Sequence, residues 1–424
     1  MFQTRVLLVI SIFVFVFALI LAESWVLSLE SRLRGRILRI QFVIMLQMLM
    51  ILMSLFVWKN LTLSQPEGTD QPHWIRSSVW KCILICFLVL AHSSYISNVF
   101  LVRTEPTVIA LVCYFCLGVQ VQMCTFLILS KVYNFVLKLI GKAPAKKITV
   151  AMIAVLYAFS IGSYGFYKIN QPPVIRHVSI PIKGLSPNLD GFTITLLSDI
   201  HLGPTVGKTQ LEKAVQICNS IISDIVVIDG DLVDGQVSDL KEAIQPLQNL
   251  KSKHGILYVT GNHEYFTMDV ENWMTELQSL GVKVLHNMNV KIPEDNEEEQ
   301  TICFVGVNDL EADRIRYNGH GMKLDSAIEG CSSEQTVILL AHQPHAAKMA
   351  ITSGHKIDLI LNGHTHGGQV FPMVIGAYLF NPFYVGLYQR GETYIYVTPG
   401  TYYWGIPMRV FTQHEITKIT LVSS

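Results

Sequence analysis

The chain has no net charge and no basic surplus in its second half. Its 32 Lys and Arg residues balance its 32 Asp and Glu residues, but residues 1–167 carry a net charge of +9 and residues 168–424 a net charge of −9. The acidic half lacks the positive surface that binding to a polyanion requires, so we expect no nucleic acid partner. Carboxylates gathered around bound cations would explain part of the negative excess.

Several sequence signatures are also missing. Neither G-x-G-x-x-G nor G-x-x-x-x-G-K-[ST] occurs, so the phosphate loops of the two common nucleotide-binding folds are absent. No internal repeat has the period of a solenoid. A nucleotide-binding domain of either kind and a repeat architecture are therefore not expected.

Cysteine is sparse outside the apolar part of the chain. Five of the eight cysteines lie in apolar stretches, and the other three are Cys218, Cys303 and Cys331. An odd, scattered set predicts neither a disulfide framework nor a C-x-x-C metal pair in the second half. Cys113-x-x-Cys116 has no second pair, so we interpret it as two small residues in a membrane helix. The cysteines leave the cellular compartment open.

Long apolar runs fill the first 167 residues. Each is close to the ~20 residues that a bilayer-spanning helix needs, and together they predict five spans: 6–21, 40–57, 82–102, 108–129 and 148–167. The first run could instead be a signal peptide, but Glu23-Ser24-Trp25 makes a poor cleavage site. No Asp or Glu lies inside a span, so we expect residues 1–167 to be a multi-pass membrane anchor rather than a transport path.

Membrane orientation is undecided by sequence. The Lys and Arg residues are shared almost equally between the two sides of a five-span topology. Glycosylation of the single sequon, Asn60-Leu61-Thr62, would place the second half of the chain in the cytosol, whereas the lysine-rich loop at 131–147 favours the opposite orientation.

The membrane region ends at Pro172 and Pro173, because paired prolines stop a helix and stiffen a short linker. We expect a linker and an entry strand at 168–189, and a separate domain at 190–424 in which strands and helices alternate. The clearest helix patterns cover 209–220, 239–250 and 269–280.

Polar residues follow five apolar, strand-like runs in this second domain. They are Asp199 and His201, Asp231, Asn262 with His263 and Glu264, His342, and His364 with His366. Three of the runs recur about every thirty residues, the length of one βα repeat. Because groups at strand exits of an open α/β sheet converge on one crevice, we expect seven of these side chains to meet.

Carboxylate, imidazole and amide donors without thiolate suit divalent ions such as Mn²⁺, Fe²⁺ or Zn²⁺. Seven ligands are too many for one catalytic ion that keeps an open position. Two ions that share a carboxylate fit better, at the ~3.5–4 Å separation of two-metal phosphatases and nucleases.

The five blocks, in this order, resemble the calcineurin-like metallophosphoesterase superfamily over residues 190–424. The segments 198–203 and 364–369 are most similar to its bacterial YkuE/YaeI-like branch. The resemblance implies a four-layer α/β/β/α sandwich behind a helical membrane bundle. It also implies that one ion is held by Asp199, His201, Asp231 and His366, and the second by Asp231, Asn262, His342 and His364.

The resemblance further implies a phosphohydrolase that cleaves phosphomonoesters or phosphodiesters with a metal-activated hydroxide. Asp231 would bridge the two ions, and His263 would contact phosphate or protonate the leaving group, with Glu264 orienting it. Gly230-Asp231-Leu232-Val233-Asp234 is not followed by the Arg that phosphoprotein phosphatases carry, so a phosphoprotein substrate is disfavoured. The alternatives are an inactive membrane scaffold or receptor and, last, a transporter with a regulatory domain.

An aromatic segment at 371–387 follows the ligand block of His366. It suggests either a flap that receives a lipid phosphate or ordinary hairpin and core packing, and we favour the packing interpretation. The lipid bilayer is the expected partner of the first domain. Oligomeric state and the choice between lipid and soluble phosphate esters are not settled by sequence.

Overall fold

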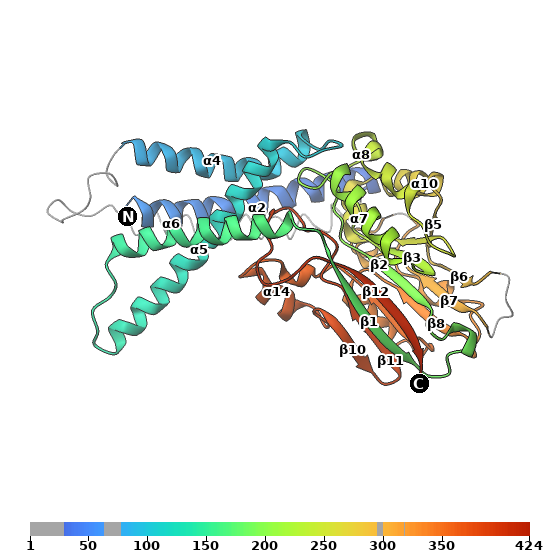
Figure 1. The fold of residues 1–424 in the computed structure, drawn as a ribbon. Coiled ribbons are helices and arrows are strands. Elements are labelled where there is room, and N and C mark those ends of the chain that lie inside the picture. Colours follow the sequence, from blue (N-terminus) through green and yellow to red (C-terminus); the bar gives the residue numbers. More distant parts are fainter. Residues whose placement is uncertain (1–28, 63–77, 295–299, 318) are drawn as a thin grey trace.

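The computed structural model describes residues 29–62, 78–294, 300–317 and 319–424. A bundle of long helices lies on one side and a domain of two β-sheets on the other (Figure 1). The described part of the chain contains four candidate membrane spans. The expected span at 6–21 lies outside the described residues, so the count of five stays a prediction.

Within the described residues, the bundle contains four helices: α2 (Ser31–Leu61), α4 (Ser78–Phe100), α5 (Val108–Leu139) and α6 (Lys147–Ile169). Each is long and apolar enough to cross a membrane. The bundle core takes buried side chains from every helix, among them Met50, Leu84, Leu117 and Ala154. The helix α2 begins at Ser31 rather than at residue 40, because Arg and Leu are good helix formers and extend it beyond the apolar run.

Two mixed sheets of six strands each form the second domain. The first has the order β1 (Val174–Ile182), β12 (Glu415–Ser423), β2 (Thr193–Leu197), β3 (Ile225–Asp229), β4 (Ile256–Val259), β5 (Val282–Val284). The second has the order β10 (Gly386–Arg390), β11 (Thr393–Val397), β9 (Leu359–Asn362), β8 (Thr336–Leu340), β7 (Ile302–Gly306), β6 (Met288–Ile292). The central strands β2, β3 and β4 run parallel, as do β7, β8 and β9.

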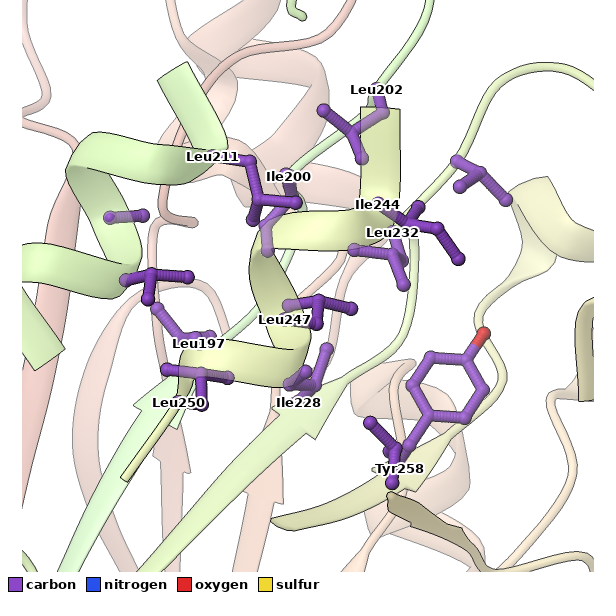
Figure 2. Packing of buried hydrophobic residues seen from close by; sticks show 14 of the residues in the cluster. Leu197, Ile200, Leu202, Leu211, Ile228, Leu232, Ile244, Leu247, Leu250 and Tyr258 are labelled. Carbon is purple, nitrogen blue, oxygen red and sulfur yellow. The ribbon is translucent and has the colours of Figure 1, made fainter. Parts of the chain in front are cut away.

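The two sheets pack face to face, and helices cover their outer faces. Because side chains alternate along a strand, Leu196 points into the core between the sheets, whereas Leu197 packs under the helix layer. In that outer layer, Leu211 of α7 (Lys208–Ile221) lies beside Ile200, in the same buried cluster as Leu197 and Ile228 (Figure 2). The helices α12 (Leu324–Ile328) and α13 (Pro344–Ala350) cover the second sheet. The result is a four-layer α/β/β/α arrangement.

The predicted helices are present with one change. The helix expected at 239–250 is divided into α8 (Val237–Ile244) and the 3₁₀ helix η2 (Gln245–Asn249). The break falls at Pro246, whose ring removes a backbone donor and disfavours a continuing α-helix. The helix expected at 269–280 is α10 (Val270–Ser279), which is followed by Gly281 in the left-handed region at φ 82°.

The membrane bundle and the second domain are joined by side-chain and backbone contacts. The guanidinium of Arg34 at the start of α2 donates to the carbonyl oxygens of Ile315 at 2.6 Å and Arg316 at 2.7 Å. Residues 168–189, expected as linker and entry strand, hold the end of α6, the edge strand β1 and the 3₁₀ helix η1 (Pro187–Leu189). Because α6 is followed almost directly by β1, the second domain lies against one end of the bundle (Figure 1).

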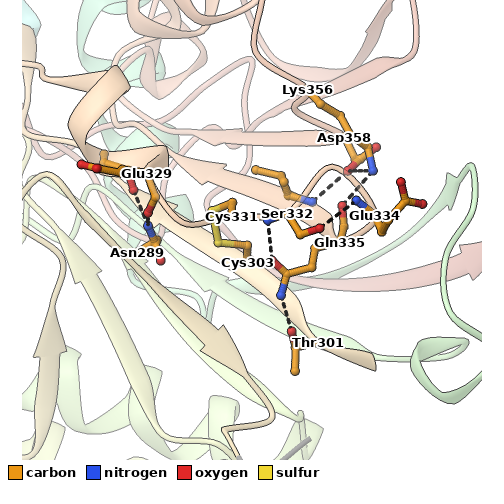
Figure 3. The surroundings of a disulfide bond; sticks show 12 residues. Asn289, Thr301, Cys303, Glu329, Cys331, Ser332, Glu334, Gln335, Lys356 and Asp358 are labelled. Atoms are coloured by element: carbon orange, nitrogen blue, oxygen red, sulfur yellow. Dashed lines mark hydrogen bonds and ion pairs between the residues drawn. A yellow bond between two sulfur atoms is a disulfide. The ribbon is translucent and has the colours of Figure 1, made fainter. Parts of the chain in front are cut away.

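One expectation about cysteine is wrong. Cys303 on β7 and Cys331, which follows α12, form a disulfide (Figure 3). Sequence spacing did not indicate this pair, because the two residues are brought together only when α12 packs over the second sheet. Asn289 reinforces the same packing, since its side-chain amide donates to the carbonyl oxygens of Ala327 at 2.7 Å and Glu329 at 2.9 Å.

Candidate metal centre

The seven expected ligands lie where strands of both sheets end. Asp199 and His201 follow β2, Asp231 follows β3, Asn262 begins α9 (Asn262–Thr267) after β4, His342 follows β8, and His364 and His366 follow β9. The two packed sheets place these strand ends side by side, and the structure brings all seven residues into one site.

The backbone in this site takes conformations that L-residues rarely adopt. Five of the seven residues have φ in the left-handed region: Asp199 (55°), His201 (54°), Asp231 (50°), His364 (71°) and His366 (50°). Each such residue costs of order 1–3 kcal/mol and persists where the surroundings determine it strongly. Strain of this kind concentrates at functional sites.

Two glycines allow the loops to approach closely. A Cβ added to Gly230 would lie 2.6 Å from the backbone nitrogen of Gly261 and 2.7 Å from Nδ1 of His342. A Cβ at Gly363 would overlap the hydroxyl of Ser198. Neither position has room for a side chain, which explains why glycine precedes Asp231 and His364 in the sequence.

A first group of donors consists of Asp199, His201 and His366, whose ligand atoms all lie within 4.8 Å of one another. The Nε2 atoms of His201 and His366 are 2.9 Å apart, and Oδ1 of Asp199 lies 3.3 Å from Nε2 of His366. All three residues are almost fully buried. Two imidazoles and a carboxylate at these separations could hold one divalent ion.

A second group consists of Asp231, His342 and His364, again with ligand atoms within 4.8 Å. Nε2 of His342 lies 3.0 Å from Oδ2 of Asp231, and Oδ1 of Asn262 lies 2.8 Å from Nδ1 of His364. Oδ2 of Asp231 is also 3.7 Å from Nε2 of His201. The carboxylate of Asp231 therefore lies between the two groups.

Hydrogen bonds fix which imidazole nitrogens carry lone pairs. Nδ1 of His342 lies 2.7 Å from the carbonyl oxygen of Asp229, so it must donate, and Nε2 is then the acceptor atom. That Nε2 is buried and has no hydrogen-bond partner in the described part of the chain, although Asp231 is close. Nδ1 of His201 lies 2.9 Å from Oδ1 of Asp234, which likewise turns the Nε2 lone pair into the site. An orphaned lone pair facing carboxylates fits a cation.

The electrostatics of the second group agree with this. Burial lowers the pKa of His342, but the charge of Asp231 outweighs it and raises the pKa well above its usual value, so a cation bound at Nε2 would take the place of a proton there. Burial lowers the pKa of His364 to about 3, so this ring is neutral at physiological pH. The site has an excess of negative charge that a cation would neutralise, and a neutral imidazole is the form that binds metal.

His263 lies beside the two groups rather than within one. Its Nδ1 is 2.6 Å from Oδ1 of Asp234, and its backbone N–H donates to Oδ1 of Asp231 at 2.8 Å. Burial lowers the pKa of His263, but the charges of Asp231 and Asp234 raise it to about 9. His201, Asp231 and His263 also have ligand atoms within 4.8 Å of one another. His263 is therefore held protonated next to the candidate ligands.

Glu264 does not orient His263, as the resemblance had suggested. Its carboxylate accepts backbone N–H groups of Gly261 at 2.7 Å, Asp231 at 3.0 Å and Leu232 at 2.7 Å. It therefore fixes the loop that carries Asp231, and Asp234 takes the orienting position. Asp234 was visible in the sequence only as part of the G-D block, because its contacts depend on the folded geometry of that loop.

Arg409 is a second residue that sequence reasoning missed. It is buried with 1% of its surface exposed, and its guanidinium donates to the carbonyl oxygens of Pro399 at 2.6 Å and His366 at 3.1 Å. It ties the loop of His366 to the C-terminal part of the chain. No local pattern around Arg409 indicates this role, since its partners lie on other loops.

A cavity of about 380 Å³ opens onto the candidate ligands. One side is lined by Asp231, Asn262, His263, His364 and His366, together with Trp404, whose ring centroid is 5.3 Å from that of His263. The other side is lined by residues of α2 and by Tyr95 of α4. The candidate ligands are thus accessible from a pocket that both parts of the molecule build.

Comparisons with known proteins bear on the family to which the chain belongs. Residues 192–368 match the family described as calcineurin-like phosphoesterase. The chain is 42% identical to the transmembrane protein with metallophosphoesterase domain of Danio rerio, over 92% of this chain and 90% of the relative. The protein of the same name from Bos taurus is also 42% identical, over 93% and 92%. The uncharacterized metallophosphoesterase YkuE of Bacillus subtilis is 29% identical, over 62% of this chain and 91% of the relative.

The vertebrate relatives are named as transmembrane proteins, and four helices of this chain are long and apolar enough to span a membrane. The chain is therefore a multi-pass membrane protein. With relatives that match it across both the helical bundle and the domain that carries the metal centre, it belongs to the calcineurin-like metallophosphoesterase family.

Proposed function

We propose that the protein is a membrane-anchored, two-metal phosphohydrolase that cleaves phosphomonoester or phosphodiester bonds. The observation that carries this proposal is the pair of donor groups with Asp231 between them. Seven donors on five separate loops, six of them buried and His364 partly exposed, are costly to assemble in a folded site, and divalent cations are the ligands that such a set suits.

Asp199, His201, Asp231 and His366 would hold one ion, and Asp231, Asn262, His342 and His364 would hold the other. When bound, the two cations lower the pKa of water from about 15.7 to about 7 and neutralise charge on the phosphoryl oxygens. The donor set admits Mn²⁺, Fe²⁺ or Zn²⁺, because it contains imidazole and oxygen ligands but no thiolate.

The chain supplies positioning and a proton. Asp234 accepts the Nδ1 proton of His263, so Nε2 is the atom that can give a proton to the departing alkoxide. Asp231 holds the backbone N–H of His263 at 2.8 Å, which couples the position of this ring to that of the candidate bridging ligand. Trp404 and Phe266, with ring centroids 5.3 Å and 5.2 Å from that of His263, flank the ring and restrict water.

The aromatic segment at 371–387 is partly buried and partly exposed. Phe383 is buried with 3% exposed, in line with ordinary packing, but α14 (Met373–Phe380) has no buried residue. No described residue of this segment lines the cavity. The segment is therefore not a flap over the metal centre, and α14 offers an exposed apolar surface next to the bundle.

The alternative is an inactive membrane scaffold or receptor that uses the same fold for binding. A decayed site normally lacks a ligand, whereas here every donor is present and directed into the site. The enzymatic proposal is therefore the better supported of the two.

The test uses the purified full-length protein. Metal content is measured after incubation with saturating Mn²⁺ or Zn²⁺, and hydrolysis is followed with p-nitrophenyl phosphate and bis-p-nitrophenyl phosphate. We expect two ions per chain and turnover of at least one substrate. A folded protein that binds no metal and hydrolyses neither would reject the proposal.

A further inference from the structure

The membrane helix α2 forms one wall of the cavity over the metal centre. Residues from its amino-terminal half line the cavity opposite the candidate ligands, namely Gly35, Leu38, Arg39, Phe42 and Val43. Tyr95 of α4 completes this wall. In Figure 1, α2 runs from the far end of the bundle to the helices of the phosphoesterase domain. A pocket for a purely soluble substrate would have no need of a membrane helix as its wall.

The length of α2 places this wall at the edge of the bilayer. Its 31 residues extend over about 46 Å at ~1.5 Å per residue, more than the ~30 Å of a hydrocarbon core. The surplus lies at the amino-terminal end, where Arg34 binds the phosphoesterase domain, because Trp58 and Lys59 near the other end are typical of a membrane interface. Phe42 and Val43 then lie close to the level at which α2 enters the lipid.

The docking of α2 is tight. A Cβ at Gly35 would overlap the side chain of Met268, so the helix touches the phosphoesterase domain at this residue. Leu38 packs against a buried cluster that includes Tyr265 and Ile315. The wall is therefore fixed relative to the metal centre, and a substrate must fit between them.

The chemistry of the cavity changes from one side to the other. The metal side is polar and acidic, whereas the membrane side offers Leu38, Phe42 and Val43. Phe266, Met268 and Ile315 of the phosphoesterase domain continue the apolar lining. A ligand that fills this cavity has a phosphate at one end and hydrocarbon at the other.

Arg39 supplies a cation between these two surfaces. It lines the cavity and lies within electrostatic range of Asp234. Arg314, the other arginine of the lining, is paired with Glu311 through two hydrogen bonds of 2.7 Å and 2.6 Å. Arg39 makes no hydrogen bond or ion pair with any described residue, and a guanidinium is suited to bind phosphate oxygens in pairs.

We propose that the substrate is a phospholipid, whose phosphate ester reaches the metal centre while its acyl chain lies against α2 and Arg39 contacts the phosphate. This inference rests on the proposed phosphohydrolase function and names its substrate class. The exposed helix α14 supports it, since Tyr378, Leu379 and Phe380 are 67%, 67% and 78% exposed beside the bundle and suit an interfacial position. Gln122 of α5 anchors this segment by donating to the carbonyl oxygen of Phe371 at 2.5 Å.

The experiment compares substrates that differ only in their acyl chains. Full-length protein in detergent micelles, loaded with Mn²⁺, is given phosphatidate or phosphatidylglycerol in phosphatidylcholine mixed micelles, and the soluble counterparts glycerol 3-phosphate and glycerophosphoglycerol. p-Nitrophenyl phosphate and its bis ester report on the phosphohydrolase itself. We expect kcat/KM for at least one lipid to exceed that of its soluble counterpart by about 100-fold, a gain that burial of a few methylene groups provides.

Two variants test the assigned wall. Arg39→Gln should lower the ratio of lipid to soluble kcat/KM by about tenfold, the effect of losing one charge-assisted contact. Val43→Trp should lower the same ratio by filling the acyl-chain space. The matched controls Arg36→Gln and Met45→Trp change exposed residues of α2 outside the lining and should leave the ratio unchanged.

The outcomes separate the two proposals. Hydrolysis of the p-nitrophenyl esters with no preference for lipid, or a ratio that responds equally to the variants and their controls, would overturn the phospholipid assignment and leave the phosphohydrolase in place. Failure of every substrate with metal bound would overturn both. A lipid preference that only Arg39→Gln and Val43→Trp reduce would establish it.

Discussion

The two walls of the cavity differ in how well their roles can be predicted from sequence. The metal-side wall consists of Asp, Asn and His residues at strand ends, where such residues have few structural reasons to gather. The membrane-side wall consists of Leu38, Phe42 and Val43, which cannot be told from lipid-facing residues of any apolar helix. Asp231 is 2% exposed and Phe42 is 47% exposed, so the first wall is built into a core and the second is open at its edge.

Because of this difference, the two walls have different roles in the site. The buried wall specifies the reaction, because metal ligands must be held by surroundings that tolerate little movement. The membrane wall specifies which phosphate ester reaches it. Substitutions in the first wall should therefore stop catalysis, and substitutions in the second should change substrate preference.

The largest effect is expected at the residue that both donor groups share. Asp231→Asn should abolish both metal binding and hydrolysis. We expect turnover to fall by more than ~10⁴-fold, which is the largest loss usually seen when a single proton-transfer group is removed. The charge of one carboxylate is lost from both ions while the shape of the side chain is kept. Metal analysis and hydrolysis of bis-p-nitrophenyl phosphate measure the two effects.

The control is Asp239→Asn, an exposed carboxylate on α8 outside the site, which should behave as the wild type. Two bound ions with normal turnover in Asp231→Asn would refute the assignment of Asp231 and, with it, the sharp distinction between the two walls.

His263→Ala should separate chemistry from metal binding. We expect both ions to be retained and turnover to fall by about 10²-fold or more, because a proton donor is lost but no ligand. The deficit should be smaller for p-nitrophenyl phosphate than for an alkyl ester such as phosphatidate, since the aryl leaving group needs less protonation. If the variant loses metal instead, His263 is a ligand, as its distance to His201 and Asp231 would allow.

Asp234→Asn addresses a residue that supports the metal-side wall without belonging to either donor group. Oδ1 of Asp234 lies 2.9 Å from Nδ1 of His201 and 2.6 Å from Nδ1 of His263. Loss of its charge should weaken metal affinity by about 10-fold to 100-fold, the usual range for a partner of a metal-binding His. A metal titration followed by activity measures this, and an unchanged affinity would show that Asp234 serves His263 alone.

The extent of sequence-based prediction follows the same division. The strand-exit residues were predictable, because a buried strand followed at once by Asp or His is a local pattern. The contact of Asp234 with His263, the Arg409 anchor and the Cys303–Cys331 disulfide were not, since each joins segments that only the packing of the layers brings together. The α2 wall was missed for another reason: apolarity predicts membrane insertion but not which face of a helix meets a neighbouring domain.

The two walls share one property, the side of the membrane on which they lie. The disulfide Cys303–Cys331 is typical of an oxidising compartment, and it lies in the phosphoesterase domain. Lys131 and Lys138 of α5 and Lys147 of α6 lie at the opposite end of the bundle. An excess of lysine at the end of a membrane helix is typical of the cytoplasmic side. Asn60 lies in the last turn of α2 with its amide donating to the carbonyl oxygen of Phe56 at 2.6 Å, a poor glycosylation acceptor.

These observations favour a phosphoesterase domain on the extracytoplasmic side, which Lys251→Thr can test with the smallest disturbance to function. The change creates a sequon at Asn249, an exposed residue of the phosphoesterase domain away from the cavity. In a eukaryotic host we expect a glycosidase-sensitive band shift in this variant and none that depends on Asn60, as Asn60→Gln would show. A shift that is lost in Asn60→Gln, with none gained in Lys251→Thr, would place the domain in the cytosol. The phospholipid would then come from the cytoplasmic leaflet, because the α2 wall opens at the same membrane edge in either orientation.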